Sequence, residues 1–547
     1  METASLEEWS RALLTDVSDT TRAIQEEPIS LQEVDCHLLH MWEARNGLHK
    51  SWKKQKHNRK LKLRIAELDR QIEDYANALT RQHWHQICDS LRESLGNAKT
   101  WHLLRHLLDP NNTKTEQRKN LSRLLYQYDG STQTLLQNLR AIYIGHNPPT
   151  TLEDYTGLPN ADLDSPILES EVRAALHKIR TQSAPGENKI NNKTLRNLDD
   201  ASIQALTQLF SKCWEEGALP QEWKHAKVKF IPKRGKPLTL NNLRPISLTS
   251  CVGKLFEHIT LSRMQNHLED CRLLPVSMIG FRPNLSTQHI FLQLNPQIYG
   301  PEQTRRYRAI VGLDLKKAFD NVLHTTIMQT LNGIRVGTKT YNYIRAFLTD
   351  RTATLNIEDI QSPPIALGRR GTPQSSVLSP FLFSLALLTL PNKLVTVPGL
   401  SHSLYADDIT IWADARSEEE LEGILQQGID IVSGAVKTFG LACSPEKSEY
   451  MIVRPSGLRR NTTKFAPCRM KLLLEGETLP TRDNIRILGM TFQSNVNRHS
   501  GMGEADLLRL IQAFVISRVT YAAPYMRPLK LERDKLNRII RGPTKWR

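Results

Sequence analysis

Two acidic motifs are the features of this 547-residue chain that are best suited to chemistry. Asp314 follows the apolar run 309–313, and Asp407 and Asp408 precede the apolar run 409–412. Short apolar runs rich in β-branched residues predict strands that are buried on at least one face. Neighbouring carboxylates in an apolar hairpin are costly unless a cation neutralises them. The pattern therefore predicts a cation site at the ends of two strands.

Hard divalent cations are the natural partners of such carboxylates. Mg²⁺ usually takes one or two protein carboxylates together with substrate phosphates. Three aspartates on two adjacent strands could hold two Mg²⁺ ions about 4 Å apart, the spacing that serves phosphoryl transfer. We therefore expect Asp314, Asp407 and Asp408 to bind two Mg²⁺ ions, with Mn²⁺ as an alternative.

At these residues the chain resembles the reverse transcriptases of non-LTR (LINE-type) retrotransposons, of the jockey-like and tick-transposon type. The resemblance covers residues 180–500 and rests on a series of motifs in the family's order. The series is Ser183-Ala184-Pro185-Gly186, 230–237, 243–248, Gly280-Phe281-Arg282, Asp314 with Ala318-Phe319-Asp320, 371–380, Tyr405-Ala406-Asp407-Asp408, Glu446-Lys447 and Leu488-Gly489. It implies an RNA-directed DNA polymerase that adds dNTPs to a primer 3′-OH, with template RNA and primer DNA as partners.

The resemblance also assigns roles to single residues. It implies that Asp314, Asp407 and Asp408 are the catalytic metal ligands, with the carbonyl of Leu315 beside them. Lys447 matches a lysine that protonates the leaving pyrophosphate, so it joins the catalytic set.

Other matches concern the nucleotide and the template. Phe319 matches the family's steric gate, whose ring would exclude a ribose 2′-OH. The residues implied to contact the incoming nucleotide or the template are Lys233, Arg244, Phe319, Gln374, Ser375 and Tyr405. An RNA-dependent RNA polymerase shares the expected architecture, but such an enzyme must admit the 2′-OH, and Phe319 argues against it.

One position departs from the family's pattern. The family has glycine where this chain has Ser375. Glycine allows a positive φ and a close backbone approach to a ligand, and serine does so less readily. This substitution leaves open an alternative function, that of a catalytically inactive nucleic-acid-binding remnant of such an element.

The overall charge indicates a polyanionic partner. The 73 Lys and Arg outnumber the 57 Asp and Glu, which gives a net charge of +16. Neutralising phosphates supplies most non-specific affinity for nucleic acid. The charge is consistent with a ribonucleoprotein containing the element's RNA, whereas the alternative is a basic protein with no such partner.

The cysteines and the apolar stretches bear on location. The seven cysteines are scattered, odd in number and free of Cys-x-x-Cys spacing. This pattern favours reduced thiols in the cytoplasm, the nucleus or both. The longest apolar stretch, 377–390, contains Pro380 and is too short to span a bilayer. We expect no membrane partner, and we interpret this stretch as a buried helix beneath the catalytic sheet.

The order of elements predicts an α+β fold. We expect the right-hand polymerase fold, with fingers, a palm built on an antiparallel sheet, a helical thumb and an N-terminal helical extension. The predicted domains are a helical extension over 1–125, a linker over 126–165, fingers and palm over 166–495, and the start of a truncated thumb over 496–547. We expect a fragment that lacks an endonuclease and C-terminal domains.

Local patterns predict the elements that hold the motifs. Helices are expected over 168–180 and 194–216, and a strand over 228–231. Ser417 with Glu420 forms a capping box that predicts a helix ending near Gly440. A strand is expected over 451–453, and the family resemblance implies that 488–492 is the hairpin that grips the primer. The basic run 51–64 has two interpretations, a nucleic-acid-contacting arm or a solvated helix face.

Overall fold

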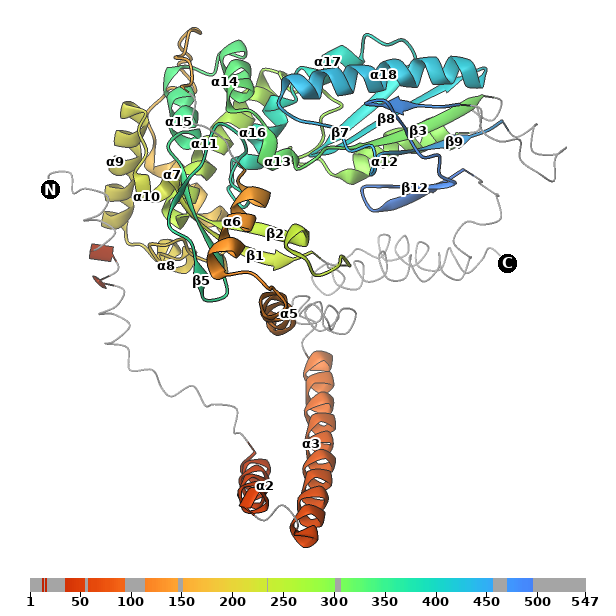
Figure 1. Ribbon diagram of the computed structural model, residues 1–547. Helices are drawn as coiled ribbons and strands as arrows, with labels where there is room; N and C mark the ends of the chain where they lie inside the picture. The colour runs from red at the N-terminus through yellow and green to blue at the C-terminus, as the bar shows by residue number, and fades with distance from the viewer. Residues whose placement is uncertain are drawn as a thin grey trace, which may run out of the picture. The chain divides into compact units, whose positions relative to one another are not determined.

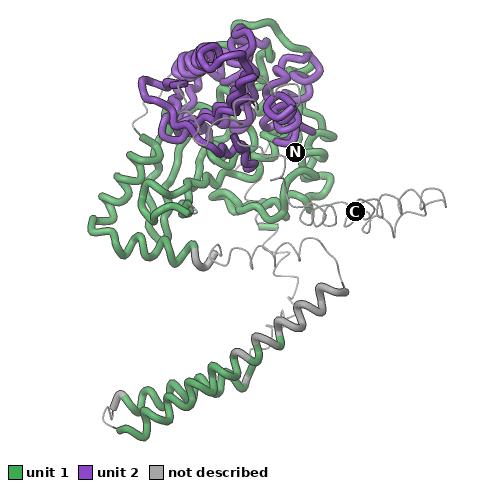
Figure 2. Tube along the Cα trace, turned by 90° about the vertical axis from the view of Figure 1, so that its right-hand side faces the viewer, with its two compact units in different colours: residues 1–262, 335–369, 373–378 green, residues 263–334, 370–372, 379–547 purple. Residues whose placement is uncertain are grey.

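The computed structural model describes residues 12–13, 15–16, 35–54, 58–93, 114–145, 151–233, 235–300, 306–455 and 470–494. The chain divides into two compact units, which Figure 2 colours separately. Unit 1 comprises residues 1–262, 335–369 and 373–378, and unit 2 comprises residues 263–334, 370–372 and 379–547. The expected thumb, 496–547, lies outside the described residues. The predicted domain boundaries therefore stay a prediction.

Unit 1 combines helices with one mixed sheet (Figure 1). Its helices are α2 (Cys36–Lys54), α3 (Arg59–Glu93), α5 (Lys114–Tyr126), α6 (Thr132–Tyr143), α7 (Glu169–Lys178), α8 (Asn192–Arg196), α9 (Asp200–Glu216), α10 (Gln221–Lys224), the 3-10 turn η2 (Leu240–Asn242) and α15 (Thr338–Leu348). Its strands are β1 (His225–Pro232), β2 (Leu243–Leu248), β4 (Thr352–Ile357), β5 (Ile360–Gln361) and β6 (Ile365–Ala366). Helix α11 (Cys251–Asp270) contains the boundary between the units.

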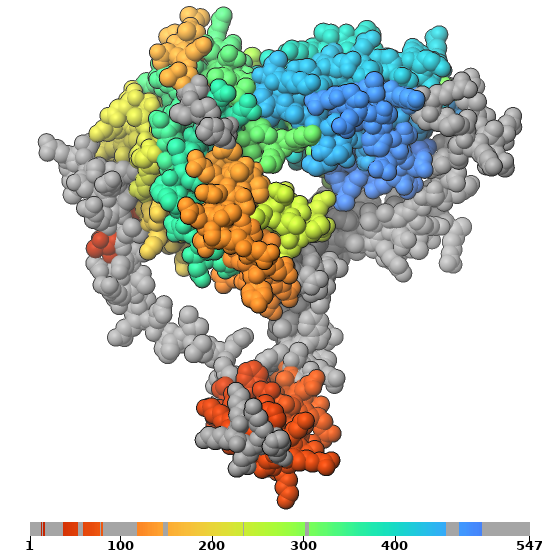
Figure 3. Space-filling view, in the orientation of Figure 1, coloured from red at the N-terminus to blue at the C-terminus, as the bar shows by residue number. Residues whose placement is uncertain are grey.

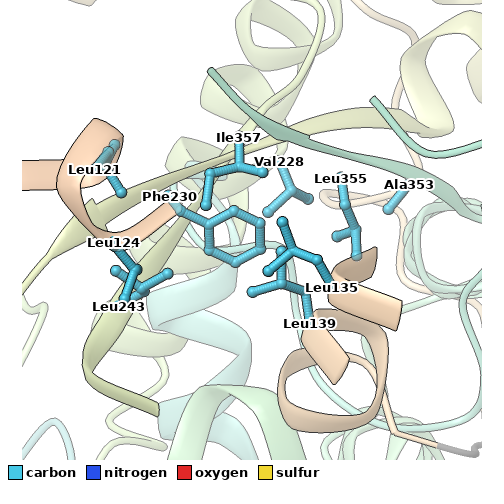
Figure 4. Close-up of a cluster of buried hydrophobic side chains, with 10 residues drawn as sticks. All are labelled: Leu121, Leu124, Leu135, Leu139, Val228, Phe230, Leu243, Ala353, Leu355 and Ile357. Carbon is cyan, nitrogen blue, oxygen red and sulfur yellow. The ribbon is translucent and has the colours of Figure 1, made fainter. Parts of the chain in front are cut away.

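The sheet of unit 1 has the order β2-β1-β4-β5, with β6 also paired to β4. Strand β1 pairs antiparallel with β2 and parallel with β4. Helices α5 and α6 cover it, and their leucines meet the strands in one buried cluster (Figure 4). The cluster consists of Leu121, Leu124, Leu135, Leu139, Val228, Phe230, Leu243, Ala353, Leu355 and Ile357. The outer surfaces of α5 and α6 are the orange region of Figure 3.

Helix α6 departs from the expected linker over 126–165. The side chain of Ser131 caps its N-terminus by accepting a hydrogen bond from the N–H of Thr134. Leu135 and Leu139, one helical turn apart, are fully buried against the sheet. The turn-forming residues that flank this segment suggested a linker, but the leucine spacing gives α6 an apolar face that the sheet buries.

Unit 2 is built on an antiparallel sheet of order β7-β8-β3-β9. Its strands are β3 (Tyr307–Asp314), β7 (Leu400–Tyr405), β8 (Asp408–Ala415), β9 (Glu449–Val453), β10 (Leu473–Leu474), β11 (Glu477–Thr478), β12 (Asn484–Ile487) and β13 (Met490–Gln493). Its helices are α12 (Thr287–Tyr299), α13 (Ala318–Asn321), α14 (His324–Gly333), α16 (Ser379–Ala386), α17 (Leu390–Leu394) and α18 (Glu418–Thr438). This sheet and its helices confirm the expected α+β palm architecture.

Helix α18 packs on strands β8, β3 and β7 (Figure 1). Ser417 caps it by accepting a hydrogen bond from the N–H of Glu420, and Gly440 follows its end with a φ of +79°. Both ends are as the sequence predicted. A second apolar cluster joins α12 and the β12–β13 hairpin to the central strands through Leu294, Ile298, Ile310, Trp412, Met451, Val453, Ile485, Ile487 and Phe492.

Helices α2 and α3 pack against each other as a pair. The hydroxyl of Tyr75 donates to Asp35, 2.9 Å away, and Arg45 pairs with Asp69. Whether the basic residues of this pair contact nucleic acid stays a prediction. None of the helices that the structure describes combines the length and the apolar content that a bilayer crossing requires.

Candidate active site

The register of two strands brings the acidic motifs together. Strands β3 and β8 pair antiparallel over eight residues, from Tyr307 opposite Ala415 to Asp314 opposite Asp408. The motifs are far apart in the sequence, yet two of their carboxylates stand on directly opposed residues. Opposed residues on neighbouring strands have Cβ atoms about 5 Å apart. The sheet therefore gathers the carboxylates at one end.

The hairpin β7–β8 places the third carboxylate. Tyr405 pairs with Asp408, so only Ala406 and Asp407 form the turn. Ala406 has a φ of +56°, which is uncommon for a residue with a Cβ. The tight turn puts Asp407 next to Asp408. Tyr405, which is half-buried, lies opposite Asp408 on the neighbouring strand.

The protein environment opposes the ionisation of Asp407 and Asp408. Desolvation, with Asp407 and Asp314 nearby, raises the pKa of Asp408 to about 6, although part of this side chain reaches solvent. Desolvation also raises the pKa of Asp407, with Asp314 adding to the shift and Lys447 opposing it. Like charges and lost hydration are thus only partly offset, and a cation would offset them further.

A turn at residues 444–448 holds the backbone of Asp314 and places a lysine beside its carboxylate. The N–H of Ser444 donates to the carbonyl of Asp314 at 2.8 Å, and the N–H of Asp314 donates to the hydroxyl of Ser448 at 3.1 Å. Lys447, in the same turn, donates from Nζ to Oδ2 of Asp314 at 2.9 Å. The lysine and the carboxylate that the sequence suggested for catalysis therefore form an ion pair.

The donor set is consistent with a divalent cation. Within the described ranges, no three His, Cys, Asp or Glu side chains are already gathered into a metal-binding group. Mg²⁺ requires only one or two protein carboxylates when substrate phosphates complete its ligands. Asp314 and Asp408 on opposed residues meet that requirement. Leu315 is buried and forms an isolated antiparallel β-bridge with Cys443. The role of its carbonyl as a metal ligand stays a prediction.

A cavity of about 250 Å³ adjoins the carboxylates. It lies among strands β3, β8, β9 and β12, and its polar lining includes Asp314, Asp408, Lys447, Glu449 and Arg486. Leu488, in the turn of the β12–β13 hairpin, also lines it. The predicted primer-gripping hairpin thus lies beside the acidic residues.

Phe319 lies in α13, just after β3, and its side chain is half-buried. Its carbonyl accepts a hydrogen bond from the N–H of Thr372 at 2.8 Å. Its ring contacts that of Phe383 at a centroid distance of 4.8 Å. The predicted gate therefore sits close in sequence to Asp314, with its backbone and its ring both restrained.

Four predicted nucleotide contacts belong to unit 1. Lys233 and Arg244 are exposed at the paired ends of β1 and β2, where the N–H of Lys233 donates to the carbonyl of Asn242 at 2.8 Å. The carbonyl of Gln374 accepts from the N–H of Ser247, in β2, at 3.0 Å. Strand β2 therefore carries Arg244 and also anchors Gln374.

Ser375 has a φ of +88°. This is the left-handed region that favours glycine, so the serine occupies a glycine-type conformation, with a cost of order 1–3 kcal/mol. The side chain is exposed. The departure from the family's glycine is therefore a strained backbone position.

The sequence analysis did not identify Glu257, a buried residue of α11. Its Oε2 accepts hydrogen bonds from the hydroxyl of Ser376 at 2.5 Å, the N–H of Val377 at 2.7 Å and the N–H of Leu378 at 3.2 Å. These bonds fix the chain directly after Ser375. No sequence signal marked it, because α11 carries several other charged and polar residues.

Comparison with known proteins connects this geometry to a family. The family model described as "Reverse transcriptase (RNA-dependent DNA polymerase)" matches residues 231–492, which include both acidic motifs. This chain carries a reverse transcriptase domain. The described part of the domain contains the β3–β8 pairing and the turn at 444–448.

Relatives with similar sequences come from mobile elements. The RNA-directed DNA polymerase from mobile element jockey of Drosophila melanogaster is 27% identical over 331 residues, 58% of this chain and 36% of that protein. Its counterpart from Drosophila funebris is 28% identical over 272 residues, 48% of this chain and 29% of that protein. The retrovirus-related Pol polyprotein from type-1 retrotransposable element R2 of Popillia japonica is 28% identical over 302 residues, 53% of this chain and 40% of that protein.

The chain thus spans less than half the length of each of these relatives. The domain resembles the polymerases of non-LTR retrotransposons, as the sequence motifs suggested. A solved structure of apo telomerase from Candida tropicalis, truncated from its C-terminal domain, aligns with 53% of this chain and 58% of that chain at 14% identity. Its TM-score of 0.35 is too low to add to the argument.

Proposed function

We propose that this chain is an RNA-directed DNA polymerase that transfers deoxynucleotides from dNTPs to the 3′-OH of a primer. The observation that carries the proposal is the register of β3 against β8, which opposes Asp314 and Asp408 at one end of the sheet. The reverse transcriptase domain over 231–492 supports the same reaction. The proposed partners are template RNA, primer DNA and dNTPs, with the element's RNA in a ribonucleoprotein.

The proposed cofactor is a pair of Mg²⁺ ions, with Mn²⁺ as the alternative. Asp314, Asp407 and Asp408 would hold them, with the carbonyl of Leu315 as a further ligand. Bound there, divalent ions would activate the primer 3′-OH and stabilise charge on the leaving pyrophosphate.

The chain's own residues position the reactants and hold a proton. The paired strands orient the carboxylates, and in phosphoryl transfer such positioning and electrostatics are most of the protein's contribution. Lys447 keeps its ammonium 2.9 Å from Asp314, beside the reacting phosphates of the proposed complex. We propose that this ammonium gives a proton to the leaving pyrophosphate.

The proposed substrate selection rests on the residues that the family resemblance assigned to the nucleotide and the template. The ring of Phe319 would exclude a ribose 2′-OH and so favour dNTPs. Lys233 and Arg244 would contact the triphosphate. Gln374, Ser375 and Tyr405 would border the nucleotide and the template.

A second candidate function is a catalytically silent nucleic-acid-binding remnant. The observation that favours it is the φ of +88° at Ser375. A strained serine beside Gln374 could hold the proposed nucleotide-binding loop in a less productive conformation. This candidate predicts RNA binding without primer extension.

Primer extension on an RNA template with Mg²⁺ and dNTPs tests the proposal. Asp407→Ala should abolish extension, whereas Asp430→Ala, which removes an exposed carboxylate from α18, should leave it intact. Extension that survives Asp407→Ala would contradict the assigned site. A folded, RNA-binding wild-type protein that extends no primer would favour the silent remnant.

A further inference from the structure

The loop 275–282, which carries the Gly280-Phe281-Arg282 motif, is clamped by its own arginine. Arg282 forms a two-pronged ion pair with Glu269, with Nε to Oε1 at 2.7 Å and Nη2 to Oε2 at 2.6 Å. Its Nη1 donates to the carbonyls of Pro275 and Met278, both at 3.0 Å. A bidentate arginine–carboxylate pair of this kind fixes the relative orientation of the two side chains. The loop is therefore held in one conformation.

The same loop is fastened to the hairpin that carries Asp407. The N–H of Leu404 donates to the carbonyl of Ser277 at 2.9 Å, and the N–H of Ile279 donates to the carbonyl of Leu404 at 3.0 Å. A Cβ on Gly280 would lie 2.5 Å from the backbone nitrogen of Ala406, so only glycine fits. The loop thus has a fixed place against the acidic turn.

Phe281 is held in a strained backbone conformation that positions its ring. Its φ is +61°, a conformation that is unfavourable for a residue with a Cβ. Its carbonyl accepts a hydrogen bond from Nε2 of Gln265 at 3.0 Å. Phe281 is 37% exposed, so its ring is only partly covered by neighbouring side chains.

The ring of Phe281 contacts the ring of Phe319. Their centroids are 6.3 Å apart with an interplanar angle of 73°, the edge-to-face arrangement that aromatic pairs favour. Phe319 also contacts the fully buried Phe383 at 4.8 Å. The Phe319 ring therefore has one aromatic neighbour in the core and one on the loop 275–282.

We propose that Phe281 fixes the orientation of the Phe319 ring and thereby sets how strongly the polymerase rejects ribonucleotides. The inference rests on the proposed function. A gate excludes a 2′-OH only while its ring cannot turn away from the sugar. Phe383 contacts this ring from the core, and Phe281 gives it a second aromatic contact from the loop 275–282. Phe281 is thus a positioning residue for substrate selection, separate from the catalytic carboxylates.

Single-nucleotide insertion of a dNTP and of the matching rNTP, on one primed RNA template, tests the inference. Phe281→Gly removes the ring and suits the positive φ, so its effect does not come from added backbone strain. Phe281→Tyr keeps the ring. Val276→Ala changes an 80% exposed side chain of the same loop and serves as the matched control.

Phe281→Gly should lower the ratio of kcat/KM for dNTP over rNTP by about tenfold, within the range that pocket shape supplies. Most of the change should come from faster rNTP insertion. Phe281→Tyr and Val276→Ala should keep the wild-type ratio. A purely structural role would lower both insertion rates together and leave the ratio unchanged, which would overturn the inference.

The outcomes separate this inference from the proposed function. A wild-type protein that inserts no dNTP refutes the polymerase function, and the inference falls with it. A wild-type protein that inserts dNTPs, with the same ratio in Phe281→Gly, refutes the inference alone. If thermal melting shows that Phe281→Gly is unfolded, Phe281→Leu replaces it, because leucine keeps most of the apolar volume without an aromatic edge. Phe281→Leu should lower the ratio less than Phe281→Gly would. An unchanged ratio in Phe281→Leu would refute the inference.

Discussion

The Nζ of Lys447 lies 2.9 Å from Oδ2 of Asp314, although 133 residues separate them in the sequence. The contact arises because the turn at 444–448 closes over the end of β3 through backbone hydrogen bonds to Asp314. A proton-bearing ammonium and a carboxylate that would hold a metal ion are thereby kept side by side. Substitutions of the lysine can separate its structural contribution from its chemical one.

Lys447→Met should slow primer extension strongly while leaving the melting temperature nearly unchanged. The side chains of the pair are 61% and 28% exposed, so the pair contributes about 1 kcal/mol or less to stability. Loss of a general acid costs roughly 10²–10⁴-fold in rate. Lys447→Arg should keep the ion pair but remain slow, because a guanidinium does not release its proton.

Lys316→Met is the matched control for Lys447→Met. It breaks another exposed lysine–carboxylate pair of unit 2, Lys316 with Glu446 at 3.7 Å. Extension rate and melting temperature should both stay near wild type. Single-turnover kinetics and thermal melting measure the two quantities. Equal loss of rate in both lysine variants would show that general positive charge, and not Lys447 itself, matters.

Asp408→Asn should abolish extension and raise the melting temperature of the metal-free protein at neutral pH. Desolvation and the neighbouring Asp407 and Asp314 raise the pKa of Asp408, so its ionised form is disfavoured in the folded state. Asparagine has a similar shape and carries no charge. The gain should disappear when Mg²⁺ is added, because the ion stabilises only the ionised wild-type site.

Asp414→Asn controls for the loss of an aspartate from the same strand. Asp414 lies in β8 and pairs with Arg306 at 2.7 Å, so its carboxylate is compensated. This variant should keep extension activity and should not gain stability. A melting temperature of Asp408→Asn at or below that of the wild type would contradict the destabilising role of the clustered carboxylates.

Ser375→Gly should stabilise unit 1 by up to about 1 kcal/mol, because it relieves a positive φ that serine adopts at a cost. The φ of +88° identifies this position as the strained one. Ser375→Ala keeps the Cβ and should give no gain. Chemical denaturation measures the difference. If the silent-remnant candidate is correct, Ser375→Gly should also turn an inactive protein into an active one.

The stability of unit 2 should fall as the pH drops through about 6.5, in part because of His402. This residue is buried, and burial lowers its pKa below the ordinary value. The folded state then resists a proton that the unfolded chain accepts, so acid favours unfolding. The ring hydrogen-bonds to Ser277 at 2.9 Å, which ties β7 to the loop 275–282.

His402→Gln should remove part of this acid sensitivity, because glutamine cannot be protonated in this range. Melting temperatures compared between about pH 8 and about pH 5 measure the slope for each variant. His177→Gln, at an exposed position of α7, should leave the slope unchanged. An identical slope in His402→Gln would show that other groups dominate the acid response.

The amino-acid sequence alone predicted the parts of this protein that depend on local patterns. The strand before Asp314 and the Ser417 cap of α18 appear where periodicity and turn chemistry placed them. The hairpin that the family resemblance implied over 488–492 is formed by β12 and β13, over 484–493. The order of motifs indicated the family. The helix α6 was missed because its flanking turn residues outweighed the spacing of Leu135 and Leu139 in the prediction.

The tertiary structure decided which of these parts meet. Strand register sets Asp314 opposite Asp408, and a one-residue slip would turn every side chain to the other face. The turn at 444–448 brings the ammonium of Lys447 to the carboxylate of Asp314. The ion pair of Arg282 holds the loop in which the ring of Phe281 contacts the ring of Phe319. These contacts join residues that are distant in sequence, so no local pattern encodes them. They follow from the packing of the sheet and the loops fastened to it, which only the folded chain defines.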